Sequence, residues 1–310
     1  MSIKFDPGRL YRSPEGYNKV IAHYDKTFNS MGIPYQSLYV ETSFGPTQVV
    51  VCGEGNEKPV VLWHGQNANA STFVRWIPVL AKEYQVFAVD TIGGLGKSAP
   101  VRLSRKGPEY EEWAAEVVRG LDIQRGNMIG VSNGGWLVLK LGSNAPDLVG
   151  SAILLSSAGF MPISIKLMLQ IIVSALSGKP PEIAENLVKL LSPPDLPPDP
   201  FYVEFFELIL TSKFRSEPIS PRIRDEELKK FHPPTYLLMG QYETSFNPYR
   251  AVKRAVDLLP QVMKAEIVPV VGHSMEHKKP DWVISRITDF LNGYAVDSVP
   301  SAYLKKLTII

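Results

Sequence analysis

The residues with the clearest chemical meaning form the pentapeptide Gly130-Val131-Ser132-Asn133-Gly134. An apolar run precedes it and a helical apolar run follows it, so Ser132 is predicted to lie on a sharp turn between a strand and a helix. Such a turn requires glycine beside the serine and projects its hydroxyl away from the backbone. The pattern predicts a serine nucleophile for acyl transfer. A glycine-rich turn that carries an inert serine is the alternative.

A serine hydroxyl is a weak nucleophile near neutral pH, so a base must accept its proton. Three histidines follow Ser132 in the chain: His232, His273 and His277. His273 comes just after the last apolar strand, so it is predicted to lie at the edge of the sheet where Ser132 emerges. His232 precedes two prolines at the opposite edge, and His277 lies in a charged stretch typical of the surface. His273 is the predicted base.

An acid must orient that base, and Glu243 is predicted to do so. It stands four residues after Met239, the end of a buried strand, which places its carboxylate at the same edge. Asp257 and Glu266 fall within a predicted helix and a predicted strand, and the strand over residues 151–155 is not followed by a carboxylate. A solvated loop glutamate is the alternative interpretation of Glu243.

The tetrahedral intermediate of acyl transfer carries an oxyanion that backbone N–H groups must stabilise. One predicted donor is the N–H of Asn133, directly after the nucleophile. The other is the N–H of Gln66, in the His-Gly-Gln-Asn loop that follows the apolar strand 59–63. His64 opens this loop and precedes Ser132 in the chain, so an orienting hydrogen bond suits it better than the role of general base.

The elements that must position these residues follow an α/β pattern. Short apolar runs alternate with amphipathic segments, which is typical of a mostly parallel sheet with flanking helices. The predicted strands, of which the first two form an antiparallel hairpin, span residues 37–42, 47–52, 59–63, 85–89, 127–131, 151–155, 235–239 and 265–271. The predicted helices of this part span residues 71–83, 109–121, 134–143, 248–259 and 281–292.

The alternation stops after Gly159, and the next seventy or so residues contain apolar helical runs without a convincing strand. A cluster of prolines within residues 193–200 cannot continue a helix or a central strand, so it is predicted to be a rigid connector. A sheet interrupted in this way predicts a core covered by a cap. The predicted parts are a core with an amino-terminal helix (1–159), a helical cap (160–231), and the rest of the core with a carboxyl-terminal tail (232–310).

These features resemble the α/β-hydrolase superfamily over residues 35–292. The family pattern is a His-Gly turn, a Gly-x-Ser-x-Gly elbow, an acid after the next-to-last strand and a histidine after the last strand. The matching residues are His64-Gly65, Ser132, Glu243 and His273. The resemblance implies the α/β-hydrolase fold, with an inserted all-helical cap, and cleavage of a carboxylic ester through an acyl-enzyme on Ser132.

Within the superfamily, the chain looks closest to the carboxylesterase NP (naproxen esterase) branch. The segments that carry this likeness are Phe44-Gly45-Pro46-Thr47-Gln48, Asp90-Thr91-Ile92-Gly93, and a glutamate where most members have aspartate. Many members have glycine at the third and fifth positions after the aspartate. Here the glycines are Gly93, Gly94 and Gly96, and this departure affects the predicted wall of the pocket.

Two further chemistries are open to the same three residues. The superfamily resemblance permits C–C bond hydrolysis and cofactor-free perhydrolysis, which the sequence does not separate from ester cleavage. A non-catalytic ligand receptor on the same fold is an alternative of another class, and the intact set of Ser132, Glu243 and His273 weighs against it.

A second motif, Gly94-Leu95-Gly96-Lys97-Ser98, ends like a phosphate-binding loop. The complete pattern needs a glycine at the position of Thr91, so the backbone cradle for a phosphate is incomplete. Nucleotide binding is therefore not predicted.

The apolar residues of the cap are expected to set the size of the substrate. Its charges nearly cancel, so no ionic substrate is indicated, and we expect a largely apolar acyl or alkyl group. The candidate lining residues are Ile163, Leu167, Met168, Ile171, Ile172, Phe201, Phe205 and Phe206. Holding the cap together is the alternative role for most of them.

The composition excludes several other classes of function. The chain has 310 residues, 45% of them hydrophobic, and a formal net charge of +2, far from the positive field that nucleic-acid binding requires. The single cysteine, Cys52, lies in a valine run and is predicted to be a buried hydrophobe, and no metal or cofactor is predicted. No apolar run could span a bilayer and the amino end lacks a signal-like apolar core, so we expect a cytoplasmic protein.

Overall fold

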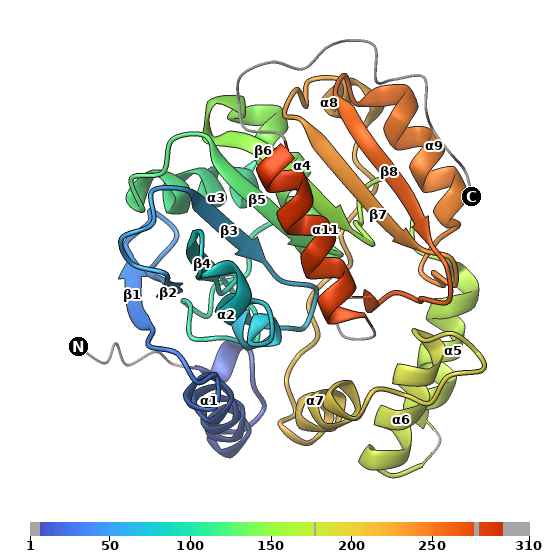
Figure 1. The fold of residues 1–310 in the computed structure, drawn as a ribbon. Helices are drawn as coiled ribbons and strands as arrows, with labels where there is room; N and C mark the ends of the chain where they lie inside the picture. Colours follow the sequence, from blue (N-terminus) through green and yellow to red (C-terminus); the bar gives the residue numbers. More distant parts are fainter. Residues whose placement is uncertain (1–6, 177, 276–278, 294–310) are drawn as a thin grey trace.

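An eight-stranded sheet forms the centre of the computed structural model, which describes residues 7–176, 178–275 and 279–293 (Figure 1). The strands are β1 (Gln36–Val40), β2 (Thr47–Cys52), β3 (Pro59–Trp63), β4 (Gln85–Val89), β5 (Gly126–Val131), β6 (Val149–Leu155), β7 (Thr235–Gly240) and β8 (Val262–Val268). Their spatial order is β1-β2-β4-β3-β5-β6-β7-β8. β2 is antiparallel to β1 and β4, and the other neighbours are parallel. The predicted opening hairpin and the mostly parallel sheet are confirmed.

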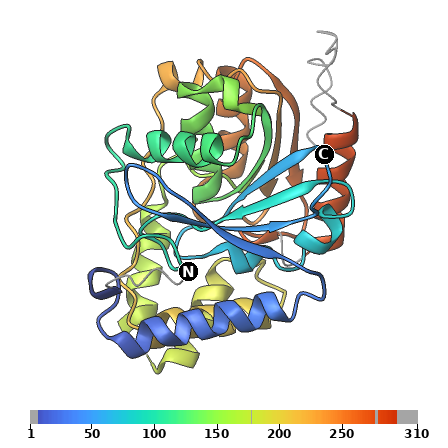
Figure 2. The same cartoon turned by 90° about the vertical axis from the view of Figure 1, so that its left-hand side faces the viewer.

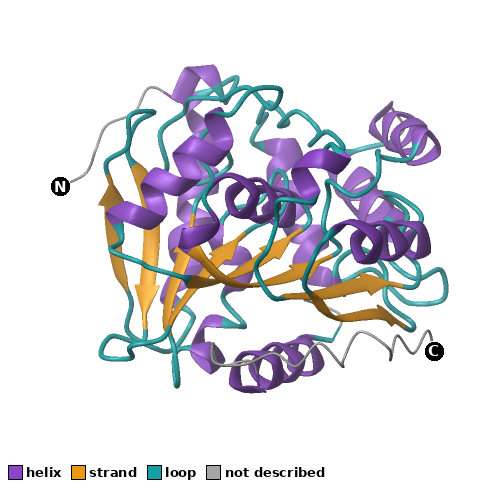
Figure 3. Ribbon diagram, turned by 90° about the horizontal axis from the view of Figure 1, so that it is seen from above, coloured by secondary structure: helices purple, strands orange, loops and turns teal. Residues whose placement is uncertain are grey.

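Helices cover both faces of this sheet, as the view from above shows (Figure 3). One face packs against α3 (Glu109–Gly120), α4 (Asn133–Asn144) and α9 (Pro248–Leu258), and the other against α2 (Ile77–Leu80) and α11 (Pro280–Gly293). Short 3-10 helices lie at Pro7–Arg9, Ala70–Phe73 and Pro146–Leu148. The predicted class of α/β protein is confirmed.

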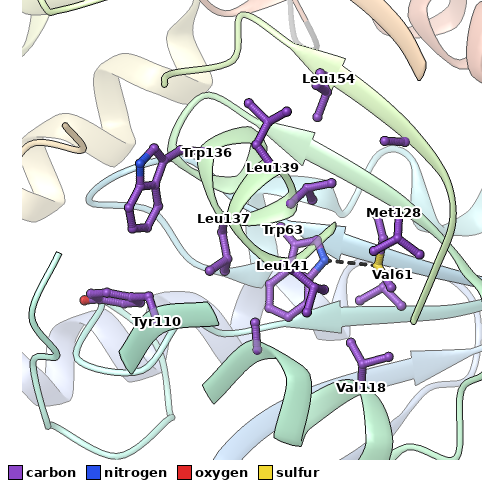
Figure 4. Close-up of a cluster of buried hydrophobic side chains, with 14 of the residues drawn as sticks. Val61, Trp63, Tyr110, Val118, Met128, Trp136, Leu137, Leu139, Leu141 and Leu154 are labelled. Carbon is purple, nitrogen blue, oxygen red and sulfur yellow. Dashed lines mark hydrogen bonds between the residues drawn. The ribbon is translucent and has the colours of Figure 1, made fainter. Parts of the chain in front are cut away.

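Alternation along each central strand explains the two layers. Val61 and Trp63 of β3 belong to the apolar cluster on the α3 and α4 side, whereas Val60 and Leu62 belong to the cluster on the α11 side. Figure 4 shows the first cluster, in which the indole N–H of Trp63 donates to the sulfur of Met128 at 3.5 Å. Because both faces are covered, the strand is apolar along its whole length.

The predicted helix over residues 71–83 is wrong in extent. The chain instead forms the 3-10 helix Ala70–Phe73 and then the short α2, with a turn between them. The cause is Pro78, which has no N–H to donate within a helix and is tolerated only in the first turn, where it stands in α2.

The last predicted strand, over residues 265–271, is displaced: β8 is Val262–Val268. It lies at the edge of the sheet, with β7 as its one strand neighbour among the described residues, so charged side chains on it can reach solvent. Lys264 lies over the ring of Tyr236, and the Tyr236 hydroxyl donates to Glu266 at 2.7 Å. These charges hid the first half of the strand in the sequence.

Residues 160–231, named the helical insertion from here on, separate β6 from β7. Their helices are α5 (Ile165–Leu176), α6 (Pro180–Leu190), α7 (Pro200–Thr211) and α8 (Asp225–Leu228). α5, α6 and α7 lie below the sheet, on the side where the parallel strands end (Figure 1). The proline-rich stretch is the connector between α6 and α7, as predicted.

The amino-terminal helix α1 (Pro14–Asn29) packs against the helical insertion as well as the sheet, which the sequence did not indicate. Figure 2 shows it lying alongside the helices of the insertion. Tyr24 and Phe28 belong to the apolar cluster on the face of the sheet that α11 covers, whereas Val20 packs with Phe205 of α7. An antiparallel bridge between Tyr11 and Phe214 strengthens the contact.

Across the stretches that the structure describes, every helix is too short or too polar to cross a bilayer. His277 and the tail of residues 294–310, both considered in the sequence, lie outside the described residues. Cys52 is buried, as predicted.

The start of α4 lies unusually close to the end of β3. A Cβ atom at Gly134 would stand 1.9 Å from the carbonyl oxygen of Trp63, and one at Gly130 would stand 2.6 Å from the Cα of Gly135. Neither contact can be relieved by moving a flexible side chain, because the atoms belong to the backbone. Glycine at these positions is therefore a condition for the strand-to-helix turn.

We expect Gly134→Ala to lower the free energy of unfolding by about 2–3 kcal/mol, because the added methyl group overpacks this contact. Gly293→Ala is the matched control, since nothing lies within 4 Å of its Cβ position, and it should change stability by no more than about 0.5 kcal/mol. Urea unfolding of both variants and the wild type measures the difference. Equal stabilities of the two variants would contradict the packing argument.

Candidate active site

Ser132 occupies the turn between β5 and α4 in a strained backbone conformation. Its φ is 51° and its ψ is −109°, a region that residues other than glycine rarely adopt. The backbone holds it there, because the Ser132 N–H donates to Leu155 O at 2.9 Å and Ala158 N–H donates to Ser132 O at 3.0 Å. The strand-turn-helix setting predicted for Ser132 is present.

His273 lies in the loop after β8 and reaches Ser132 with one ring nitrogen. The distance from His273 Nε2 to Ser132 Oγ is 3.0 Å. The His273 backbone N–H donates to the carbonyl oxygen of Leu191, at the end of α6, at 2.9 Å. The His273 ring is thus hydrogen-bonded to Ser132, and the His273 backbone is hydrogen-bonded to the helical insertion.

Glu243 lies in the loop after β7, and its side chain is fully buried. Its Oε2 is 2.6 Å from His273 Nδ1, and its Oε1 accepts the Ser245 N–H at 2.8 Å. Burial alone would raise the pKa of Glu243, but the charge of His273 and these hydrogen bonds outweigh it, so the pKa lies below its ordinary value. The ionised carboxylate accepts a hydrogen bond from Nδ1–H, which leaves Nε2 to accept a hydrogen bond from the Ser132 hydroxyl.

The structure therefore brings together the three residues that were predicted from positions far apart in the chain. The hydrogen-bonded order is Glu243, His273, Ser132. Two other described histidines lie elsewhere: His232 is exposed before β7, and His23 lies 3.7 Å from Glu204.

The two predicted oxyanion donors face the same cavity as the serine. Gln66 and Asn133 both line it, from the loop after β3 and from the first residue of α4. The first N–H groups of a helix have no partner within the helix, so that of Asn133 is available to a ligand. The Gln66 side chain donates to Glu217 O at 2.7 Å.

His64 has both ring nitrogens occupied away from the serine. Nε2 accepts the Thr91 N–H at 3.0 Å, so the proton is on Nδ1, which lies 2.8 Å from Gly65 O. Burial lowers the pKa of His64 to about 4, although the bond to Gly65 opposes the shift. This agrees with an orienting role for His64 in the loop that carries Gln66.

A cavity of about 490 Å³ opens above Ser132 and His273. Seven of the eight apolar residues named from the sequence line it: Ile163, Leu167, Met168, Ile171, Ile172, Phe205 and Phe206. Phe201 does not; its ring stacks on Phe205 at 6.1 Å between centroids and lies under Arg75. The cavity is apolar where α5 and α7 line it and polar near Ser132, Glu217 and Ser220.

A buried ion pair that the sequence does not indicate lies beside this cavity, with Glu217 in its polar wall. Arg105 Nη2 lies 3.1 Å from Glu217 Oε2, and the two residues are 112 positions apart. Burial raises the pKa of Glu217, and Arg105 opposes the shift. Spacing carries no signal for such a contact, because Arg105 follows β4 and Glu217 belongs to the helical insertion.

In the stretch that resembles a phosphate-binding loop, Lys97 and Ser98 form hydrogen bonds and an ion pair with other residues of the chain. The Lys97 N–H donates to Asp90 at 2.8 Å, the Lys97 ammonium pairs with Asp25, and the Ser98 hydroxyl donates to Asp90 O at 2.6 Å. Burial raises the pKa of Asp90 to about 6, although the hydrogen bonds that its carboxylate accepts from the N–H groups of Lys97 and Ala70 oppose the shift. Within the described residues, no cluster of three or more His, Cys, Asp or Glu side chains could hold a metal ion.

The fold and the site together define the class of protein. A family model described as the alpha/beta hydrolase fold matches residues 58–198. The crystal structure of naproxen esterase (carboxylesterase NP) from Bacillus subtilis matches with a TM-score of 0.79 and 26% identity, covering 90% of this chain and 99% of that chain. The chain has the α/β-hydrolase fold.

Relatives named as carboxylesterases are similar to it over most of its length. The uncharacterized carboxylesterase nap of Bacillus subtilis (strain 168) is 27% identical over 279 residues, which are 87% of this chain and 91% of the relative. Carboxylesterase YbfK of the same strain is 25% identical over 283 residues, 87% of this chain and 92% of the relative. The resemblance to the carboxylesterase NP branch is confirmed.

Because the pKa of His64 is lowered in the folded chain, the free energy of unfolding should depend on pH. Below pH 6.5 the unfolded chain binds a proton at His64 that the folded chain does not bind until about pH 4. Stability from this residue is therefore complete above pH 6.5 and is lost as the pH falls toward 4.

In His64→Gln the amide oxygen still accepts from Thr91, but nothing titrates. We expect the wild type to lose about 2 kcal/mol more stability than this variant between pH 7 and pH 5. Urea unfolding of both proteins at the two pH values measures the loss. Parallel pH dependence of the two proteins would show that His64 is not held neutral by the fold.

Proposed function

We propose that this chain is a serine hydrolase that cleaves carboxylic esters of small, largely apolar substrates through an acyl-enzyme on Ser132. The observation that carries the proposal is the hydrogen-bonded chain from Glu243 through His273 to Ser132 at the floor of an apolar cavity. The relatives named as carboxylesterases support the ester as the substrate class.

Acylation uses the geometry of the three side chains. Ser132 Oγ attacks the ester carbonyl carbon while its proton passes to His273 Nε2, and the carbonyl oxygen becomes an oxyanion. The Glu243 carboxylate stabilises the imidazolium that forms, since it already accepts from Nδ1. When the C–O bond to the alcohol breaks, Nε2 gives its proton to the leaving oxygen.

Deacylation repeats the sequence with water. A water molecule gives a proton to His273 Nε2 and attacks the acyl carbon, and collapse of the second intermediate breaks its bond to Ser132 Oγ. The proton returns to Ser132, and the carboxylic acid leaves. We assign stabilisation of both oxyanions to the N–H groups of Gln66 and Asn133, which line the cavity from two separate segments. The proposed reaction requires no cofactor.

We further propose that residues 160–231 act as a cap that selects the substrate, between core parts at 1–159 and 232–310. The support is the apolar wall that α5 and α7 contribute to the cavity. A cavity of about 490 Å³ with such a wall suits a short or medium acyl chain. The cytoplasmic location expected from the sequence stays a prediction.

The central test is turnover of p-nitrophenyl acetate and butyrate by the wild type and by Ser132→Ala. We expect the variant to lose about a thousandfold or more in turnover, because the nucleophile is removed. A fluorophosphonate should label the wild type on Ser132. Ser143→Ala is the control, since its hydroxyl has no hydrogen-bond partner among the described residues and it lies further along α4; it should retain wild-type turnover.

A wild type that neither turns over these esters nor takes the label would contradict the proposal. An inert or occluded serine would then favour a ligand receptor on the same fold. Labelling without ester turnover would instead direct attention to C–C bond hydrolysis or perhydrolysis.

Met168 tests the role of the cap. Met168→Ala should enlarge the cavity and raise the ratio of kcat/KM for octanoate over butyrate esters by about fourfold or more, since each buried methylene contributes about 0.8 kcal/mol. Leu169→Ala on the same helix is the control, because Leu169 is 58% exposed and does not line the cavity. If Met168→Ala leaves the preference across a series of acyl lengths unchanged, the cap residues do not set substrate size.

A further inference from the structure

The buried pair of Arg105 and Glu217 connects the two segments that carry the proposed oxyanion donors. Only 5% of the Arg105 side chain and 2% of the Glu217 side chain are exposed. The Arg105 guanidinium also lies over the rings of Tyr110, at 4.9 Å, and Trp136, at 5.3 Å. Both charges are thus held in a low-dielectric setting where each depends on the other.

Glu217 holds the loop that contains Gln66. Its Oε1 accepts the Asn67 N–H at 3.0 Å, and its own N–H donates to Asn67 Oδ1 at 2.7 Å. Its carbonyl oxygen accepts from the Gln66 side chain at 2.7 Å. Asn67 has a φ of 54°, so these bonds also keep a left-handed residue in place directly after Gln66.

Arg105 holds the other segment. Its Nη1 donates to the side-chain oxygen of Asn133 and to the Ser220 hydroxyl, the latter at 2.8 Å. The Ser220 hydroxyl also donates to Asn133 Oδ1. The Asn133 side chain is therefore fixed at the first position of α4, and Asn133 lines the cavity there.

We propose that Arg105 and Glu217 are a positioning pair that sets the separation and direction of the Gln66 and Asn133 N–H groups. The inference rests on the proposed function, since it concerns the oxyanion of that reaction. Neither residue exchanges a proton with the substrate; each acts through a neighbour that it holds.

A second consequence concerns the helical insertion. Glu217 and Ser220 belong to the segment that leads from α7 back toward the sheet, so the same bonds attach this segment to the donors. Oxyanion donors that depend on this contact are fully aligned only when the segment is seated. The pair thereby links the seating of the insertion to the stabilisation of the intermediate.

The expected kinetic signature follows from where the donors act. Donors that are displaced by a fraction of an ångström lose contact with the oxyanion of the intermediate, while the planar ester still binds in the apolar cavity. The loss should therefore fall on kcat and leave KM nearly unchanged. A pair that only stabilises the fold would not separate these two constants.

The test compares Glu217→Gln with Glu111→Gln. Glu111 forms a comparably buried pair with Lys140 at 3.0 Å, between α3 and α4 and away from the cavity, so it is a matched control. The measurements are kcat and KM for p-nitrophenyl butyrate, the inhibition constant of a trifluoromethyl ketone, which adds to the serine as a tetrahedral oxyanion, and that of the matching alcohol, which cannot. Urea unfolding is recorded for each protein.

We expect Glu217→Gln to lower kcat about tenfold to a hundredfold with KM within about twofold. The affinity for the trifluoromethyl ketone should fall by the same factor, and that for the alcohol should not change. Glu111→Gln should lose stability but keep kcat. Arg105→Lys is the second variant: one ammonium cannot reach Glu217, Asn133 and Ser220 together, so kcat should fall although the charge remains.

Unchanged kcat and ketone affinity in folded Glu217→Gln and Arg105→Lys would overturn the inference and leave the proposed function intact. Equal losses for ketone and alcohol would also overturn it, because the pair would then act on the cavity as a whole. A wild type without turnover or fluorophosphonate labelling would refute the proposed function, and the inference with it.

Discussion

The close approach of α4 to the ends of β3 and β5 is the constraint on which the site depends. Two glycines permit it, because any Cβ atom at Gly130 or Gly134 would overlap backbone atoms. The approach forces Ser132 into a backbone conformation with a positive φ and directs its side chain toward the cavity. It also places the start of α4 beside the loop after β3, so that Asn133 and Gln66 face the same space. Nucleophile and proposed oxyanion donors thus have a single structural origin.

The parallel sheet places the other two residues of the proposed triad, Glu243 and His273, near Ser132. Because the strands run in one direction, the loops after β7 and β8 open at the edge where β5 ends, and they carry Glu243 and His273. The helical insertion is bonded to these loops as well: Leu191 O accepts from the His273 N–H, and Leu190 O accepts from the Thr244 hydroxyl. Its other end holds the loop of Gln66 through Glu217. The insertion is therefore attached to both halves of the proposed machinery.

Much of this arrangement can be predicted from the sequence, for reasons that the structure makes plain. Strands buried on both faces read as continuous apolar runs, so β3, β4 and β5 were found within a residue. Ser132 stands directly after such a strand, and Glu243 could be selected because few other acids follow one. His273 follows the end of β8 by five residues, so its place at the same edge was predicted although the bounds of its strand were not. The bounds of an element were predicted wrongly where one residue type or an edge position changed the expected apolar pattern. Pro78 divides an apolar helical pattern, and β8 carries charges that its edge position tolerates.

Contacts between distant segments left no trace in the sequence. Arg105 and Glu217 meet only because the chain returns from α7 past the loop after β3, and a charged residue in a loop ordinarily remains in solvent. The packing of α1 against α7 is of the same kind, since an amphipathic helix shows that it has an apolar face but not what covers it. Phe201, which stacks on Phe205 and does not line the cavity, shows that apolar character alone does not distinguish lining from packing.

The central claim is that Ser132, His273, Glu243 and the two N–H groups act as one site. The most direct test is a crystal structure of the wild type after reaction with an alkyl phosphonate, whose adduct has the geometry of the tetrahedral intermediate. We expect phosphorus bonded to Ser132 Oγ and the phosphoryl oxygen within about 3 Å of the Gln66 and Asn133 N–H groups, with His273 Nε2 facing the ester oxygen. An adduct on another residue, or a phosphoryl oxygen directed away from both N–H groups, would contradict it.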